Sequence, residues 1–378
     1  MNSEPPERKI TTSPPPSFSS IPNEIIVSCL AVLSKSYYPQ LSLVSKTFDS
    51  VILSSEILLA RLHYKTQENF LHVCLQWPGR SLPSWFTLWI KPEQTLTNEL
   101  DQEDTKCSGT TMLVPIPCSY SPCVPTSYIG MAGSKYYDLI QYSISPVPSP
   151  LLVCDKGSAF TLREAPRMKL PRKNPVACIL DGKIYVMGGC NADESTNWAE
   201  VFDPNTQTWE SLPDPGPRLR SSLIKIIYPN EGKVYVSNSE KKRYFYDPKE
   251  MRWGVAAMTR KVERMCIIAG VLYAYGDENC FLWFDTKNEE WRVVKGLEVL
   301  CRNCCASALS VANYGGKMLV LWDKKQPYKW YNTNIWCSVI ALERRNGDDD
   351  VWGIVEWASV VLTVPSAYVF LRCRVETE

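Results

Sequence analysis

The sequence predicts a mainly β protein built from repeated antiparallel modules and preceded by a small α-helical segment. Three observations predict this class: a strand–turn–strand pattern that recurs along the chain, a fixed Asp-to-Trp spacing within it, and helical periodicity near the N-terminus. With 378 residues and 45% hydrophobic content, the chain can bury a large core. The length therefore indicates one large β domain and a smaller additional one.

The clearest module spans residues 181–213. An Asp-Gly turn pair precedes a short apolar run that stops at Gly188 and Gly189, which is typical of a buried strand. An alternating strand follows, and a turn then leads into a third strand that contains Trp209. Such a small sheet cannot bury two faces alone, so the modules are expected to stack against copies of themselves.

Weaker copies of this module occur near residues 133–166, 231–258, 269–297 and 315–357. In the three best modules an Asp lies six residues before the Trp, which indicates a constraint on one turn rather than an effect of composition. The positions that carry the repeat are Tyr185, Gly188, Gly189, Trp209, Tyr235, Trp253, Tyr273, Trp291 and Trp352. The repeat length is closer to the ~50 residues of kelch blades than to the periods of helical solenoids.

These modules resemble the kelch-repeat family, whose four-stranded blades are arranged radially around a central axis. The resemblance covers roughly residues 125–357 and implies a kelch-type β-propeller with about six blades, five or seven being the alternatives. The tail, residues 366–375, is strand-like but follows the last module, and residues 85–90 and 112–116 are strand-like without a module. We expect the tail to pair with one of these early segments, because an open ring would leave unpaired strand edges.

Composition excludes several classes of function. The formal net charge of +1 gives no global field that favours nucleic acid, and no apolar run reaches the ~20 residues of a membrane span. A basic cluster at residues 167–173 is interpreted as a solvated loop. Fifteen irregularly spaced cysteines without a signal peptide indicate reduced thiols in the cytoplasm and/or nucleus rather than a secreted protein.

We predict no catalytic activity, no cofactor and no metal. Only His63 and His72 are available as imidazole ligands, and both precede the repeats, whereas a galactose-oxidase-like copper propeller needs histidines inside the repeats. Cys301, Cys304 and Cys305 resemble half a zinc site, but no second ligand pair accompanies them. No nucleophile elbow or phosphate-binding loop occurs in the sequence.

The N-terminal part divides into a disordered tail at residues 1–17, a helical unit at 18–63 and a connector hairpin and polar loop at 64–110, before a propeller at 111–378. The helical unit has more apolar positions than so short a segment can bury. Ile26, Leu30 and Leu33 line one face of its first helix, and Ile25, Cys29 and Val32 line another. One face is therefore expected to bind a partner.

This helical unit resembles the F-box on two stretches, Ile21-Pro22-Asn23-Glu24 and Leu41-x-x-Val44-Ser45-Lys46-Thr47-Phe48. Together with the connector, it resembles the plant F-box/kelch-repeat proteins. The F-box resemblance implies a Skp-type adaptor as partner. The residues expected to contact the adaptor are Ile21, Pro22, Ile25, Leu30, Leu33, Leu41, Val44 and Phe48.

The resemblance implies the substrate-recognition subunit of a Skp-cullin-F-box ubiquitin ligase. The adaptor would link the chain to a cullin and a RING protein, and the propeller would hold a target protein whose identity the sequence leaves open. The alternatives are an interaction scaffold without ubiquitin transfer and a propeller enzyme. An aromatic loop with Tyr328, Trp330, Tyr331 and Trp336 is the candidate target surface, although the same side chains could simply pack between blades.

Overall fold

The computed structural model describes most of the chain. The residues that it does not describe are 1–20, 81–82, 92–93, 101–111, 116–125, 133–134, 141–150, 156–162, 173–174, 191–196, 239, 241, 257–261, 277, 305–307, 327–330, 346, 348–349 and 378. The predicted disordered tail and Leu162, which stands in the Trp place of the first module, thus lie outside the described residues. The chain forms two compact units, residues 1–67 and residues 68–378.

The first unit is helical. Its elements are α1 (Asn23–Val32), a short 3-10 helix (Lys35–Tyr37), α2 (Tyr38–Ser42), α3 (Lys46–Ile52) and α4 (Ser55–Tyr64). The hydroxyl of Ser45 accepts a hydrogen bond from the N–H of Phe48 at 3.1 Å and so caps α3. Helix α4 ends at Lys65, whose φ of 56° lies in the left-handed region that typically terminates helices.

A buried arginine holds this unit together. Arg61 on α4 is fully buried and donates from Nη1 to the carbonyls of Ala31 and Leu33 at 3.2 and 2.6 Å. These carbonyls belong to the end of α1, where a helix leaves acceptors without partners inside the helix. The hydroxyl of Tyr38 donates to a third carbonyl, that of Leu30, at 2.9 Å. The interior therefore combines apolar packing with a cap on the C-terminus of α1.

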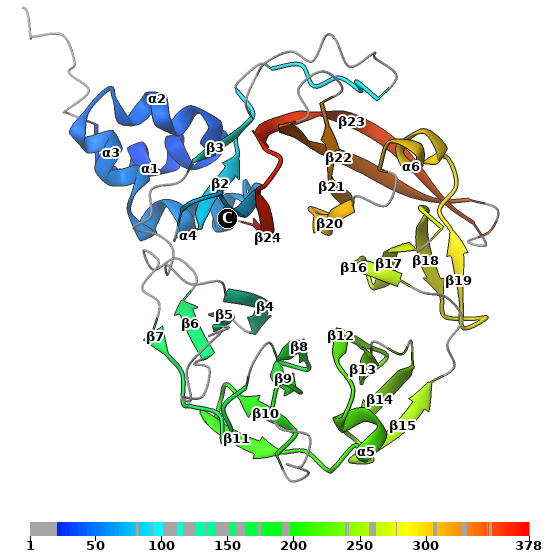
Figure 1. The fold of residues 1–378 in the computed structure, drawn as a ribbon. Helices are drawn as coiled ribbons and strands as arrows, with labels where there is room; N and C mark the ends of the chain where they lie inside the picture. Colours follow the sequence, from blue (N-terminus) through cyan, green and yellow to red (C-terminus); the bar gives the residue numbers. More distant parts are fainter. Residues whose placement is uncertain are drawn as a thin grey trace, which may run out of the picture. The chain divides into compact units, whose positions relative to one another are not determined.

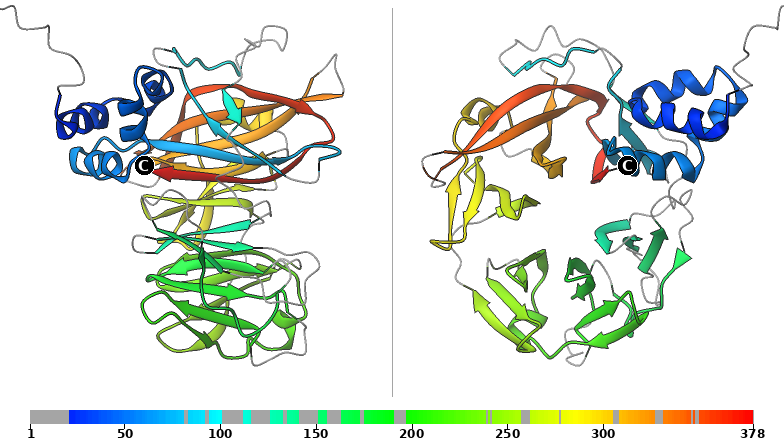
Figure 2. Two further views of the ribbon diagram at one scale, coloured as in Figure 1. Left: turned by 90° about the vertical axis from the view of Figure 1, so that its left-hand side faces the viewer. Right: turned by 180° about the vertical axis from the view of Figure 1, so that it is seen from behind.

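The second unit contains four-stranded antiparallel sheets, six of them in the part that the structure describes, arranged around a common centre (Figures 1 and 2). The sheet that contains the first and last strands of this unit, called the closing sheet, has the order β24 (Val369–Thr377), β1 (Asn69–Gln76), β2 (Ser84–Leu88), β3 (Leu113–Pro115). The next has β4 (Thr126–Ala132), β5 (Lys135–Ile140), β6 (Leu151–Asp155) and β7 (Arg163–Glu164).

Three regular sheets follow, and each is built from consecutive strands. They are β8 (Val176–Leu180), β9 (Lys183–Met187), β10 (Ala199–Asp203), β11 (Thr208–Ser211); β12 (Ile224–Asn230), β13 (Lys233–Asn238), β14 (Arg243–Asp247), β15 (Arg252–Ala256); and β16 (Val262–Ile268), β17 (Val271–Gly276), β18 (Phe281–Asp285), β19 (Glu290–Val293). The last sheet has β20 (Ala308–Tyr314), β21 (Lys317–Lys325), β22 (Asn332–Arg345) and β23 (Asp350–Pro365). Short helices α5 (Pro217–Arg220) and α6 (Glu298–Cys304) lie between sheets in the sequence. The predicted mainly β propeller is confirmed.

The first turn of the modules has a common geometry. Asp181 and Gly182 have φ angles of 49° and 75°, and Glu231 and Gly232 have 47° and 71°. Two successive positive φ values are what a type I′ hairpin turn needs, and a glycine supplies the second of them without steric cost. The same pair of angles recurs at residues 269–270.

The Asp-to-Trp spacing also has a structural cause. The carboxylates of Asp203, Asp247 and Asp285 each accept a hydrogen bond from the N–H two residues later, at 2.9, 3.0 and 3.0 Å. Four residues after each Asp the backbone has a positive φ, which completes the turn. The Trp then lies opposite an aromatic residue of the preceding strand: the pairs are Phe202–Trp209, Tyr246–Trp253 and Phe284–Trp291. Their ring centroids are 5.0, 5.3 and 5.3 Å apart.

The fourth predicted Trp position is less regular. Trp352 lies near the start of outer strand β23, as the other three lie near the starts of theirs, but its cross-strand partner is Glu343 rather than an aromatic residue. The guanidinium of Arg345 lies 4.8 Å from the centre of its ring. The stretched copy therefore keeps the place of the Trp and loses the aromatic pair.

Ring closure differs in one respect from our expectation. Strand β24 pairs with β1 from Asn69 opposite Thr377 to Gln76 opposite Val369. The first and last strands of the second unit therefore do share one sheet. The partner is β1, however, and the early segments that we had expected as partners form β2 and β3 of the same sheet. β24 has nine residues and β1 eight, so this pairing satisfies more backbone groups than one with β2, which has five residues, or β3, which has three. The hairpin predicted as a connector thus belongs to the ring.

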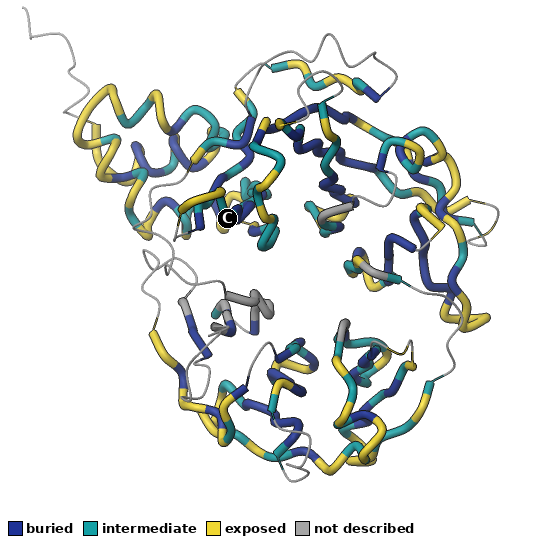
Figure 3. The backbone as a smooth tube through the Cα atoms, in the orientation of Figure 1, coloured by how far each residue is buried: buried dark blue, intermediate teal, exposed yellow. Residues whose placement is uncertain are grey.

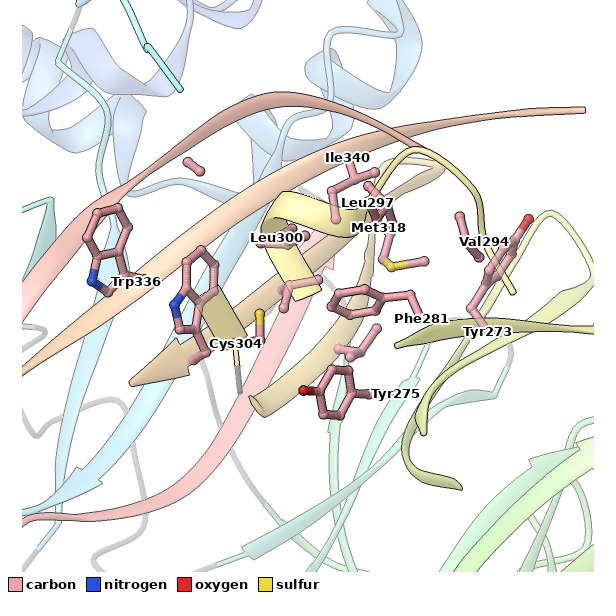
Figure 4. Packing of buried hydrophobic residues seen from close by; sticks show 14 of the residues in the cluster. Tyr273, Tyr275, Phe281, Val294, Leu297, Leu300, Cys304, Met318, Trp336 and Ile340 are labelled. Atoms are coloured by element: carbon pink, nitrogen blue, oxygen red, sulfur yellow. The ribbon is translucent and has the colours of Figure 1, made fainter. Parts of the chain in front are cut away.

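Hydrophobic clusters of buried residues join neighbouring sheets around the ring. One cluster joins the β16–β19 and β20–β23 sheets, and its members Phe281, Leu300 and Met318 lie together in Figure 4. Three further clusters join the β4–β7 sheet to the β8–β11 sheet, the β8–β11 sheet to the β12–β15 sheet, and the β12–β15 sheet to the β16–β19 sheet. A fourth joins the β20–β23 sheet to the closing sheet. None of these clusters joins the closing sheet to the β4–β7 sheet among the described residues.

One basic residue is placed differently from the prediction. Arg172, in the cluster interpreted as a solvated loop, is buried, and it pairs with the fully buried carboxylate of Glu200 at 2.7 Å. It also donates to the carbonyls of Gly188 and Trp198 at 2.8 and 2.7 Å. These acceptors compensate the cost of removing the charge from water. Gly188 and Trp198 lie at the two ends of the connection between β9 and β10, so Arg172 holds these two ends together.

Candidate functional site

Helix α1 of the helical unit has one buried and one exposed apolar face. Its buried residues are Ile26, Val27, Leu30 and Ala31, which form the core of the unit with Tyr38, Val51 and Ile57. On the opposite face Ile25 is 53% and Val32 56% exposed, and Cys29 between them is exposed as well (Figure 3). The spacing of four and three residues places these three side chains on one stripe.

The turn between α2 and α3 exposes further apolar surface. Leu43 is 87% and Val44 67% exposed, the two highest values among the apolar residues of this unit. Leu41 and Phe48 are only partly buried and pack against the core from the same region. The interior of this small unit is already occupied by other side chains. The exposed apolar surface is therefore better explained by the binding of a partner than by an incomplete core.

Most residues predicted to contact the adaptor are accessible in the structure. Ile21, Pro22, Ile25, Leu33 and Val44 are exposed, and Leu41 and Phe48 are half-buried. Leu30 is the exception, because it is 3% exposed in the core of the unit. We therefore assign Leu30 to packing and remove it from the contact set.

Sequence reasoning missed several exposed apolar residues of this unit. They are Leu43 after α2, Leu53 after α3, and Leu59 and Leu62 on α4. The spacing of Leu59 and Leu62, three residues apart, was the available signal, since it places both on one helix face. The F-box pattern matched by the sequence does not specify these positions.

The predicted target loop is only partly described. Tyr328 and Trp330 lie outside the described residues, and Tyr331 is 55% exposed. Trp336 is buried and stacks on Trp322, with ring centroids 5.7 Å apart and an interplanar angle of 18°. For Trp336 the structural alternative is therefore correct, because its ring fills the interior of the β20–β23 sheet interface.

The two ends of the strands differ in their connections. Because consecutive strands run antiparallel, the first-to-second strand turns lie at one end, called the turn end, and the second-to-third strand loops lie at the other, called the loop end. Gly188 and Trp198 lie at the loop end, and so do Gln326, Tyr331 and the segments that carry α5 and α6. In the closing sheet, β24 is the first strand and β1 the second, and Thr377 and Asn69 lie where the other sheets have their first-to-second strand turn. The chain therefore enters the β unit at the turn end.

Several of the described cysteines lie in the hydrophobic core. Cys304 lies in a hydrophobic cluster with Cys301 packed against it, and burial raises the pKa of the Cys301 thiol to about 11. Burial likewise raises the pKa of the Cys266 thiol to about 12. Within the described residues no group of three or more His, Cys, Asp or Glu side chains could hold a metal ion. No described helix is long and apolar enough to cross a membrane.

Comparison with known proteins gives consistent matches. The family model described as FKB95, Kelch-repeats domain, matches residues 85–362. A putative F-box/kelch-repeat protein of Arabidopsis thaliana is 52% identical over 374 residues, which cover 99% of this chain and 98% of that protein.

Two further putative F-box/kelch-repeat proteins of Arabidopsis thaliana match along nearly their whole length. One is 48% identical and covers 94% of this chain and 96% of its own length, and the other is 46% identical and covers 95% of both. Among solved structures, one titled "Structure of YjhT" overlaps 72% of this chain and 91% of its own with a TM-score of 0.41 and 11% identity.

Proposed function

Because this chain belongs to the plant F-box/kelch-repeat proteins, we propose that it is the substrate-recognition subunit of a Skp-cullin-F-box ubiquitin ligase. Its helical unit binds a Skp-type adaptor and, through the adaptor, a cullin and a RING protein. Its propeller binds the protein to be ubiquitinated. The chain contributes no reacting group of its own, and it acts by raising the effective concentration of target lysines near the charged conjugating enzyme.

The observation that carries the adaptor contact is the exposed apolar surface of the helical unit. Ile25 and Val32 on α1, with Leu43 and Val44 after α2, are all more than half exposed although the interior of the unit is filled. Apolar anchors that a partner covers completely typically contribute most of the binding energy of an interface.

The loop end of the propeller is the proposed target surface. It carries the irregular connections, including the exposed Tyr331, whereas the first turns at the turn end are tight type I′ pairs. Loops on a rigid scaffold are where binding residues concentrate. The first residue of β1, Asn69, lies at the opposite, turn end.

A reducing compartment, cytosol or nucleus, is the proposed location. Ten cysteines among the described residues carry free thiols, and several of them are buried in strands. Thiols of this kind persist where disulfides are kept reduced.

Isothermal titration calorimetry with a Skp-type adaptor tests the proposal. The double substitution Ile25→Ala and Val44→Ala in the full chain should weaken binding at least about tenfold, since each truncated anchor costs ~1–2 kcal/mol. Both side chains are exposed, so the fold should be unaffected. Met251→Ala, which removes a 69% exposed side chain from the β unit, is the matched control and should bind like the native chain.

Native affinity in the double variant, or no binding by the native chain, would remove the adaptor assignment. Adaptor binding without recovery of a cullin in a pulldown would favour the scaffold alternative. The target is sought among proteins that accumulate when the chain is deleted and that co-purify with it.

A further inference from the structure

Residues 96–100, called the edge strap, lie along the outer edge of the β20–β23 sheet. The N–H of Glu99 donates to the carbonyl of Ala358 at 2.8 Å, and the N–H of Ala358 donates to the carbonyl of Thr97 at 3.2 Å. Asn98 pairs with Ala358 as a parallel bridge. The hydroxyl of Ser359 also donates to the carboxylate of Glu99 at 2.8 Å. The strap thus forms an isolated parallel bridge with the edge of this sheet, where the sequence predicted a polar loop.

The two leucines of the strap lie on opposite faces of the β20–β23 sheet. Leu96 packs against the cluster shared with the closing sheet, and Leu100, 7% exposed, belongs to the cluster shared with the β16–β19 sheet. The amide of Asn303 on α6 donates to the carbonyl of Leu100 at 3.5 Å. The strap therefore passes over the sheet edge from one interface to the next.

Described residues before and after the strap in the sequence contact the closing sheet. Strand β2 ends at Leu88, and the N–H of Trp89 donates to the carbonyl of Met112 at 2.8 Å. Met112 is buried, and its own N–H donates to the carbonyl of Val361 on β23 at 3.0 Å before β3 starts. Trp89 and Met112, on either side of the strap in the sequence, therefore lie at the closing sheet, and Met112 also bonds to β23.

The strand that the strap covers has the longest outer edge of the described sheets. β23 has sixteen residues, whereas the outer strands β7, β3, β11, β19 and β15 have two to five. A long open edge invites wrong pairing, so it needs a cover. Lys295 covers the start of β23, since its N–H donates to the carbonyl of Val351 and its carbonyl accepts from Gly353, both at 2.9 Å.

We propose that the edge strap is a second fastening of the ring, independent of the β24–β1 pairing, that holds the closing sheet to the β20–β23 sheet. The chain enters the closing sheet at Asn69, so the strap fixes the entry point to the rest of the propeller whether or not the chain is a ligase subunit.

Hydrogen exchange of the full chain, followed by mass spectrometry, tests this role. In the variant Leu96→Ala with Leu100→Ala, peptides from residues 69–88 and 369–377 should exchange at least about tenfold faster, because the closing sheet opens locally. Peptides from residues 233–256 should exchange as in the native chain. Leu223→Ala, which truncates a 59% exposed leucine between two regular sheets, is the control and should change neither region.

A milder variant keeps the test informative if the double variant fails to fold. Ser359→Ala removes only the hydrogen bond to Glu99, and it should speed exchange in the same two regions about threefold to tenfold. Unchanged exchange in residues 69–88 in both variants would overturn the proposal. Equal acceleration in all sheets would overturn it too, because the strap would then be part of the general core rather than the fastening of one sheet.

Discussion

The closing sheet and the β12–β15 sheet have the same four-stranded architecture but are held together differently. The β12–β15 sheet takes its strands from one continuous stretch, residues 224–256, and each of its strands pairs with the next in sequence. The closing sheet pairs Asn69 with Thr377, across nearly the whole β unit. The first is therefore stabilised by local turns and the second by contacts that form only when the ring is complete.

This difference predicts that the same kind of damage has unequal effects. A lost local turn should weaken one regular sheet, because its neighbours still pack on both sides. A lost long-range pairing should release a strand edge in the ring and expose the core beneath it. The three experiments below test this comparison.

The largest effect is expected from removing β24. Deletion of residues 369–378 removes the partner of β1 along eight residue pairs and uncovers Leu71, Val73 and Leu75, which are fully buried. The melting temperature of the β unit should fall by more than about 10 °C, as for a loss of several kcal/mol in a domain of this size. Circular dichroism melts provide the measurement. A truncated chain that melts like the native one would show that the ring does not depend on this pairing.

The repeat tryptophans should have intermediate effects that follow their burial. Trp291 is 6% exposed and packs on Phe284, so Trp291→Ala should cost ~3–5 kcal/mol of unfolding free energy. Trp253 is half-buried, and its indole N–H donates to the carbonyl of Pro213 at 2.8 Å. Trp253→Ala should therefore cost less, ~2–3 kcal/mol.

Trp253→Phe separates the two contributions of that side chain. It keeps a ring against Tyr246 and loses the hydrogen bond, so it should cost ~1 kcal/mol. Urea unfolding measures all three variants. Equal losses of unfolding free energy for Trp291→Ala and Trp253→Ala would mean that burial does not determine how much each repeat tryptophan contributes to stability.

The same comparison explains which features the sequence could predict. The Asp-Gly turns and the six-residue Asp-to-Trp spacing are local, and their cause, an Asx hydrogen bond followed by a positive φ, lies within one turn. Patterns of this kind recur in each copy and can be recognised. The exposed stripe of Ile25 and Val32 was equally readable, because helix periodicity determines which residues share a face.

Features made by distant residues could not be predicted in the same way. The edge strap has a polar sequence apart from Leu96 and Leu100, and only its contact with β23 distinguishes it from a solvated loop. Arg172 is basic in a basic stretch, and its burial is explained only by acceptors that follow later in the sequence, the carboxylate of Glu200 and the carbonyls of Gly188 and Trp198. The partner of the tail is β1 rather than either of the two predicted segments, and the eight residue pairs of this contact exist only in the completed sheet.

The smallest effect is expected at a single turn of a regular sheet. The pKa of Asp203 is lowered, first by the hydrogen bond from the N–H of Asn205 and then by Lys183, whose ammonium lies 3.2 Å away. A carboxyl with a lowered folded-state pKa stabilises the fold above its unfolded pKa of about 3.9 and loses that contribution as the pH falls through the folded value. Asp203→Asn retains an acceptor for Asn205 but removes the charge. The variant should therefore be slightly less stable than the native chain at pH 7, and the gap in urea midpoint should close toward pH 3. A gap of constant size across this range would mean that the carboxylate charge plays no part and that the turn depends on hydrogen bonding alone.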